Sequence, residues 1–121
     1  MRLANKRTIT HAISVRQPYV ELILQGKKKF EFRSQPTNIR GRVYIYASKK
    51  LGGDENDWHQ VRSEPDLLPT GVIVGSLQIV GCKWNATEDC FAYELAKPLR
   101  LKRHLKAVNQ PLPRFWIPKF K

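Results

Sequence analysis

A chain of 121 residues and 14.1 kDa can bury one hydrophobic core but is too short for two, so we expect a single domain over residues 1–121 with its core at about 10–118. Hydrophobic residues make up 41% and charged residues 26%, which is a globular composition and excludes a disordered chain. No apolar run reaches the roughly 20 residues that span a bilayer, and the N-terminus lacks the apolar segment of a signal peptide. We therefore expect a cytoplasmic protein without a membrane partner.

The charge of the chain is strongly positive and unevenly distributed. Lysine and arginine number 22 against 10 acidic residues, which gives a net charge of +12 and a pI of about 10.1. Residues 1–53 carry +10, residues 54–96 carry −6 and residues 97–121 carry +8. This distribution favours a polyanion as the partner, above all RNA, whether single-stranded or structured. A basic surface that is merely solvated is the alternative.

The first part of the chain predicts a strand, a helix and a second strand in succession. Residues 8–15 are rich in β-branched side chains with apolar residues at alternate positions, which predicts a strand with one buried face. Pro18 suits the first position of a helix of about two turns that stops at Gly26. Residues 29–33 then predict a strand with its phenylalanines on one face and its charged residues on the other.

The rest of the chain predicts mainly β structure. The expected strands cover residues 43–48, 70–82, 91–95, 99–101 and 114–118. Residues 54–62 predict a short acidic helix. Gly75 and Gly81 lie within the longest strand and mark bulges or bends of a strongly curved sheet. We therefore expect an α+β, mainly β fold with about five to seven short strands and two or three short helices.

The most informative stretch is the spacing G-x-K-x-x-E-x-R formed by Gly26, Lys28, Glu31 and Arg33. A cation, an anion and a second cation leave one helix-to-strand corner together, and charges that close must be paired, solvated or turned toward a charged ligand. Pleat parity does not fix the direction of Lys28, but its long stem can swing toward Glu31. The alternative is a cluster that only pins the helix to the strand, with Arg33 as its most structural member.

Several segments between about residue 10 and residue 118 resemble the ASCH domain. They are the run Ile-Ser-Val-Arg-Gln-Pro-Tyr at 13–19, the G-x-K-x-x-E-x-R spacing, the strand at 41–49 and the segment at 71–75. The resemblance implies a PUA-like pseudobarrel, a cleft lined by the motif and by the first strand-helix junction, and RNA binding or RNA-linked chemistry. One branch of that family hydrolyses N4-acetylcytidine with the motif lysine and a threonine. Lys28 matches the lysine, but Glu31 stands in the threonine position and offers no hydroxyl nucleophile, so the resemblance alone does not assign this reaction, and an amidohydrolase-like or ribonuclease-like activity is kept as an alternative.

The predicted site joins the motif to three further groups of residues. Arg16 and Gln17 lie at the strand-helix junction, where the Gln17 amide could pair with a base edge. The strand end near residue 48 and the basic run near residue 100 supply hydroxyl and phosphate contacts. The predicted ligand-binding residues are Arg16, Gln17, Lys28, Glu31, Arg33, Ser48, Lys49, Lys50, Arg100, Lys102, Arg103 and Lys106.

We expect a module that binds RNA or a nucleotide in RNA metabolism. Lys28 can bind phosphate, and Glu31 can accept hydrogen bonds from an exocyclic amine such as that of cytosine. One alternative is a small hydrolase acting on RNA or a modified nucleoside, with Lys28 and Glu31 as catalytic residues. A second is an adaptor for acidic proteins. Two cysteines and three histidines without ligand spacing predict no metal ion, and we expect no cofactor.

Overall fold

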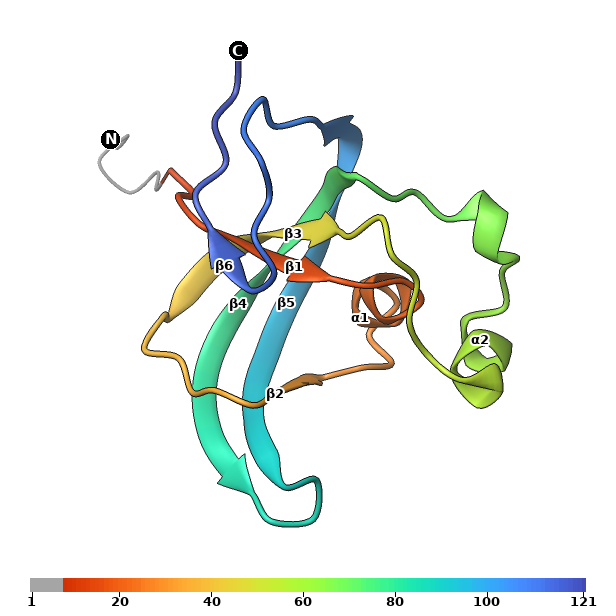
Figure 1. The fold of residues 1–121 in the computed structure, drawn as a ribbon, viewed down its shortest axis with the longest axis vertical. Coiled ribbons are helices and arrows are strands. Elements are labelled where there is room, and N and C mark those ends of the chain that lie inside the picture. Colours follow the sequence, from red (N-terminus) through yellow and green to blue (C-terminus); the bar gives the residue numbers. More distant parts are fainter. Residues whose placement is uncertain (1–7) are drawn as a thin grey trace.

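The computed structural model describes residues 8–121, and its main feature is one curved six-stranded sheet with the strand order β2-β5-β4-β3-β1-β6 (Figure 1). The elements are β1 (Ala12–Val15), α1 (Tyr19–Leu24), β2 (Phe30–Arg33), β3 (Gly41–Ala47), α2 (Glu55–Val61), the 3-10 helix η2 (Pro65–Leu67), β4 (Val72–Asn85), β5 (Cys90–Leu105) and β6 (Phe115–Trp116). β1 and β3 are parallel, and every other neighbouring pair is antiparallel. The expected α+β, mainly β fold is confirmed. Within residues 8–121, no helix has the length and apolar character needed to cross a membrane.

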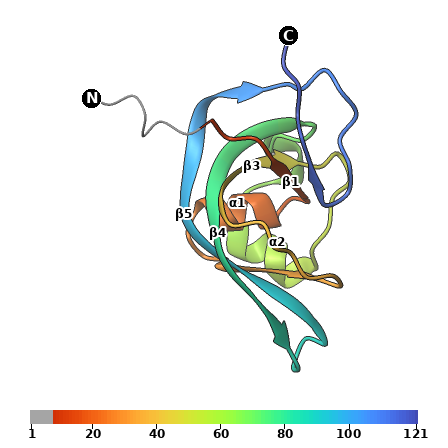
Figure 2. The same cartoon turned by 90° about the vertical axis from the view of Figure 1, so that its left-hand side faces the viewer.

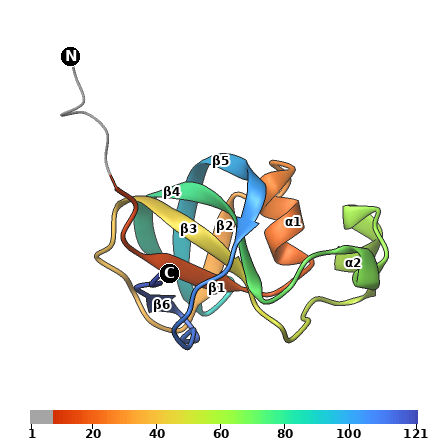
Figure 3. The same ribbon diagram turned by 90° about the horizontal axis from the view of Figure 1, so that it is seen from above.

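The main core lies between α1 and the concave side of the sheet. β4 and β5, the two longest strands, curve around α1 (Figure 2). Val20 and Ile23 of α1 share one buried cluster with Val15, Ile45 and Val74 from three strands. α2 lies on the side of α1 that faces away from the sheet (Figure 3). Each fully buried aliphatic side chain contributes about 1.5–3 kcal/mol, so this cluster fixes α1 and the corner that follows it.

The curvature of the sheet comes from irregular pairing between its longest strands. The register of β4 against β5 shifts between Ile73 and Gly75 and again between Ile79 and Gly81, which confirms both glycines as bulge positions. Bulges bend a strand and increase its twist. At Gly75 the backbone of β5 and the side chain of Leu24 come so close that a Cβ atom would not fit. The sheet can therefore wrap around α1.

Two predictions about individual strands are wrong. All four residues of β1 are buried, although one exposed face was expected. The second face is covered because Ala12 packs in a separate cluster with Tyr46 and Trp116. β5 runs without a break from Cys90 to Leu105 and is not two short strands. The expected gap between the two short strands is instead an irregular stretch within β5. Lys97 there has a positive φ of 49°, and the register against β4 shifts.

Gly75→Ala should lower the free energy of unfolding by about 2 kcal/mol or more, because the new Cβ would collide with the Leu99 carbonyl oxygen and lie 2.9 Å from Leu24 Cδ2. Gly81→Ala is the matched control. Its Cβ would lie 3.3 Å from Glu94 Oε1, at the end of a flexible side chain, and at an ordinary contact distance of 3.8 Å from Glu94 Cβ. Urea denaturation of both variants measures the difference. Equal losses would contradict the close approach at Gly75.

Candidate functional site

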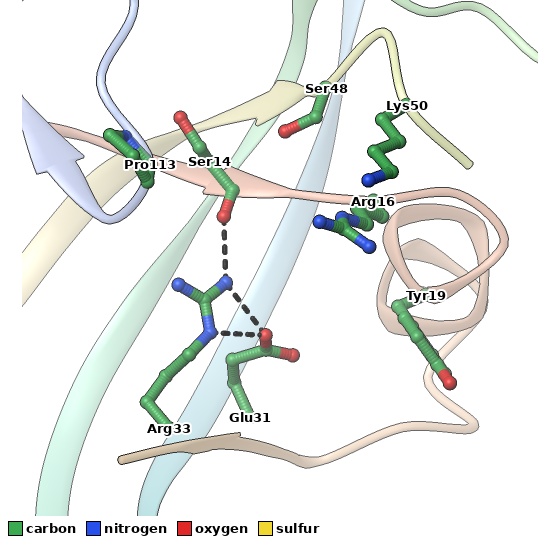
Figure 4. A pocket seen from close by; sticks show the side chains of 8 residues that line it. All are labelled: Ser14, Arg16, Tyr19, Glu31, Arg33, Ser48, Lys50 and Pro113. Atoms are coloured by element: carbon green, nitrogen blue, oxygen red, sulfur yellow. Dashed lines mark hydrogen bonds and ion pairs between the residues drawn. The ribbon is translucent and has the colours of Figure 1, made fainter. Parts of the chain in front are cut away.

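A cavity of about 390 Å³ opens between β1 and β2 (Figure 4). It is lined by Ser14, Arg16, Tyr19, Glu31, Arg33, Ser48, Lys50 and Pro113. These residues come from the ends of β1 and β3, from α1, from β2 and from the loop before β6. β1 and β2 are not neighbours in the sheet, so the cavity lies where the curled sheet stays open. Its size falls in the range of about 300–1,000 Å³ that is usual for small-molecule sites.

A buried carboxylate forms part of the cavity wall. Glu31 is only 7% exposed, and its Oε2 accepts a hydrogen bond from Arg33 Nε at 2.8 Å and forms an ion pair with Arg33 Nη2 at 2.7 Å. The same Nη2 donates to the backbone oxygen of Ser14 at 2.7 Å. Arg33 therefore connects β2 to β1 and supplies the partner that a buried carboxylate needs. Within residues 8–121, no hydrogen bond reaches the other oxygen, Glu31 Oε1.

Lys28 lies beside this carboxylate, on the turn that follows α1. Gly26 adopts a positive φ of 78°, and the backbone amide of Lys28 donates to the Leu22 carbonyl, which reverses the chain toward β2. The Lys28 ammonium is 3.6 Å from Glu31 Oε1. It also lies 5.1 Å from the ring centre of Tyr19 and 5.2 Å from that of Phe32, within the range of cation-π contacts. The cation and the anion of the motif therefore converge.

The rim of the cavity is cationic because two parallel strands end side by side. β1 and β3 pair in parallel, and the Ser48 amide donates to the Val15 carbonyl at 2.8 Å just past their ends. Arg16 follows β1 and Lys50 follows β3, and their charged groups lie near each other at the mouth (Figure 4). Both side chains are exposed. With Arg33, three cationic residues and one carboxylate line the cavity.

Tyr19 lines the cavity, and its hydroxyl forms a hydrogen bond with α2. The hydroxyl donates to Asp57 Oδ2 at 3.0 Å. Burial, this hydrogen bond and the nearby charges of Asp57, Asp54 and Glu31 raise the pKa of Tyr19 to about 12. The phenol is therefore neutral at physiological pH, and its one donor is already used. What remains for a ligand is the aromatic ring.

Gln17, one of the predicted ligand contacts, does not reach the cavity. Its side chain is fully buried, its Nε2 donates to the Pro69 carbonyl at 3.0 Å, and its Oε1 accepts from the Glu21 amide at 3.1 Å. The amide satisfies a free backbone donor at the start of α1 and ties the helix to the loop before β4. The prediction of a base contact at Gln17 is therefore wrong.

The predicted basic residues of β5 are also away from the cavity. Arg100 donates to both carboxylate oxygens of Glu21, at 2.9 and 2.8 Å, and so fastens β5 to α1. Burial raises the pKa of Glu21, but the hydrogen bonds and charge of Arg100 outweigh burial and hold it below its ordinary value. Lys102 and Arg103 are exposed on β5. Lys106 lies in a second hollow of about 350 Å³, together with Lys49.

Three residues of the cavity lining were missed by the sequence analysis: Ser14, Tyr19 and Pro113. Ser14 is the one polar residue of a buried strand, and that signal could have marked its backbone as a contact point. Its hydroxyl donates to the Leu112 carbonyl at 2.6 Å, which holds the loop before β6 against β1. Tyr19 is the first residue of α1, and helical periodicity alone does not show that it lines a cavity. Pro113 carried no local signal. Across residues 8–121, no group of three or more metal-ligating side chains is placed to hold a metal ion.

Comparisons with known proteins agree on one family. The model of the ASCH domain family matches residues 13–109, a span that includes every lining residue of the cavity except Pro113. The chain also resembles the crystal structure of a mutant ASCH protein from Zymomonas mobilis, with a TM-score of 0.61 and 14% sequence identity. That similarity covers 90% of this chain and 89% of the other, and it concerns the fold. No curated protein matches the chain in sequence.

Arg33→Met should lower the free energy of unfolding by roughly 2–4 kcal/mol, because it removes the hydrogen-bonded cation of the buried Glu31 carboxylate and leaves only the Lys28 ammonium at 3.6 Å. Urea denaturation at neutral pH measures this loss. The double variant Arg33→Met/Glu31→Gln removes the unpaired charge and should recover part of it. A loss below about 0.5 kcal/mol in the single variant would place this pair among exposed ion pairs and contradict its structural role.

Arg100→Ala should cost about 0.5–1 kcal/mol at pH 7, since half of the arginine is exposed to solvent. The pKa of Glu21 is lowered from 4.5 in the folded protein, so the stabilisation is present above about pH 4.5 and is lost as the pH falls through the folded pKa. The variant and the wild type should therefore differ in stability at pH 7 and approach each other at about pH 2. Denaturation at the two pH values measures this, and a pH-independent difference would exclude Glu21 as the partner.

Proposed function

We propose, from the premise that this chain belongs to the ASCH domain family, that it binds RNA and receives one nucleotide in the cavity between β1 and β2. The family has a PUA-like fold and is linked in general to RNA metabolism. The observation that carries the proposal is the composition of the cavity. A cationic rim surrounds the buried Glu31 carboxylate, whose Oε1 accepts no hydrogen bond from residues 8–121.

The phosphate of the nucleotide would bind at the rim. Arg16 and Lys50 lie at the mouth, are exposed, and take part in none of the ion pairs among residues 8–121. Their charges are therefore available to a phosphate. The Arg16 guanidinium can bind it with bidentate hydrogen bonds, and the Lys50 ammonium acts as a point charge. The net charge of +12 adds long-range attraction for a polyanion.

The base would bind deeper in the cavity. Arg33 occupies Glu31 Oε2, so Oε1 is the oxygen that can accept a hydrogen bond from a ligand. A fixed acceptor at the wall suits an exocyclic amine, as in cytosine, and disfavours a carbonyl at the same place, as in uracil. The Tyr19 ring offers an apolar face beside it. The site would therefore favour cytosine over uracil.

A hydrolase acting on RNA or a modified nucleoside through Lys28 and Glu31 has less support. Arg33 holds one oxygen of Glu31, and two aromatic rings surround the Lys28 ammonium. Both arrangements suit binding and fixed charge better than proton transfer or nucleophilic attack. An adaptor for acidic proteins is supported only by the overall charge.

Arg16→Ala and Lys50→Ala should each weaken the binding of single-stranded RNA and lower the slope of log affinity against log salt concentration by about 0.7 for each phosphate contact that is lost. Fluorescence anisotropy with a labelled cytidine-rich oligonucleotide between low and moderate salt measures both effects. Lys83→Ala is the matched control, because Lys83 is exposed on β4 and does not line the cavity. If all three variants behaved alike, the RNA would bind by general charge and the cavity proposal would fail.

A further inference from the structure

Strand β2 turns two aromatic side chains outward, on the face opposite to Glu31. Glu31 rises from β2 into the cavity (Figure 4), whereas its neighbours Phe30 and Phe32 are 43% and 38% exposed. Their rings stack on each other, with centres 6.5 Å apart and an angle of 24° between their planes. Single exposed apolar residues are common on protein surfaces, but two stacked rings on one strand form a continuous aromatic surface. We call this surface, made of Phe30 and Phe32, the aromatic shelf.

The aromatic shelf is connected to the cavity through one side chain. The Lys28 ammonium lies 5.2 Å from the ring centre of Phe32, which belongs to the shelf. The same ammonium lies 5.1 Å from the ring centre of Tyr19 and 3.6 Å from Glu31 Oε1, both of which belong to the cavity lining. Lys28 does not itself line the cavity, but its ammonium lies close both to residues of the cavity lining and to the shelf. The two features are therefore linked by a cation.

The charges around the shelf favour a nucleic acid over a protein as its occupant. Lys27, Lys28 and Lys29 immediately precede the shelf in sequence, and Lys27 and Lys29 are exposed. The acidic residue Glu94 pairs opposite Phe30 in the sheet, and the Glu31 carboxylate is already paired with Lys28 and Arg33. Cations interleaved with aromatic faces are the arrangement by which proteins hold single strands, because every base has a face that can stack. Duplex bases are already stacked and cannot use such a surface.

We propose that the aromatic shelf is a base-stacking subsite for the nucleotides that adjoin the one in the cavity, so that the protein binds a short single-stranded segment of RNA and not an isolated nucleotide. This inference rests on the proposed function. It assigns Phe30 and Phe32 to base contact and Lys28 to the phosphate that lies between the cavity and the shelf. The binding site is then continuous from Arg16 at the rim to Phe30 on β2.

The test compares a single-stranded RNA octamer with cytidine monophosphate. Phe30→Leu/Phe32→Leu keeps the shelf apolar but removes its aromatic faces, so it should weaken octamer binding by roughly 5- to 100-fold. It should leave the affinity for cytidine monophosphate unchanged. Phe30→Tyr/Phe32→Tyr should bind the octamer as the wild type does. Phe120→Leu is the matched control, because Phe120 is 44% exposed and packs against Tyr44 of β3.

A second measurement uses the unmodified protein and is independent of how the variants fold. Octamers with one abasic position at a time should lose affinity at the cavity position and at one or two positions to the same side of it. Combining the shelf-position abasic octamer with Phe30→Leu/Phe32→Leu should give no further loss, because both changes remove the same contact.

The outcomes separate this inference from the function on which it rests. If the wild type binds no RNA, the proposed function fails and the shelf fails with it. If Arg16→Ala weakens octamer binding but the leucine variant and the abasic octamers do not, the cavity stands and the shelf is overturned. If the leucine variant changes only the sedimentation of the protein, the shelf is a contact between copies of this chain, and the inference is also overturned.

Discussion

The candidate site depends on the Arg33 guanidinium, which bridges the Glu31 carboxylate and the Ser14 carbonyl. β1 and β2 are separated by three strands in the sheet order, so no ladder of backbone hydrogen bonds joins them. The sheet brings them together only by curling, and the bulges at Gly75 and Gly81 allow it to curl. One side chain then spans the remaining gap. The cavity is the part of the gap between β1 and β2 that remains unfilled, and the ion pair of Arg33 with Glu31 forms part of its wall.

This arrangement explains why a small basic domain keeps a buried carboxylate. A charge removed from water is costly unless it is paired, and here Arg33 forms its hydrogen bond and its close ion pair with only one of the two oxygens. The second oxygen remains directed toward Lys28 and the cavity, close to an aromatic ring. Parallel pairing of β1 and β3 places two more cations at the mouth. Structural and ligand-binding roles therefore share the same residues, and the alternatives of a structural cluster and a binding site do not exclude each other.

Local chemistry in the sequence accounts for much of this structure. The G-x-K-x-x-E-x-R spacing predicted a turn after α1, and Gly26 indeed adopts the positive φ that suits a residue without a side chain. The alternation along β2 placed Glu31 and Arg33 on one face, which is how the ion pair forms. In each case the deciding interaction lies within a few residues of the chain or in the pleat of one strand.

The predictions that failed depended on contacts between distant segments. Nothing near Gln17 shows that the loop before β4 will cover it, and nothing near Arg100 shows that Glu21 will be its partner. Phe30 and Phe32 are exposed because the other face of β2, which carries Glu31, turns toward the core. The alternation of residues along β2 does not show which of its two faces will be buried. Trp84 is large and apolar, yet it is 54% exposed because its end of the β4–β5 hairpin extends beyond the other strands (Figure 1). Tertiary packing decides these cases, and the sequence carries no local signal of it.

The most direct measurement of the central claim is an NMR titration of the isotope-labelled protein with cytidine monophosphate, followed through the arginine side-chain Nε–H signals. The account predicts saturable shifts of the Arg16 and Arg33 signals, with Arg100 unmoved because its guanidinium is held by Glu21 away from the cavity. Uridine monophosphate should give the same rim shifts at higher concentration. Shifts at Arg100 with none at Arg33 would contradict the account, because the nucleotide would then bind outside the gap that Arg33 bridges.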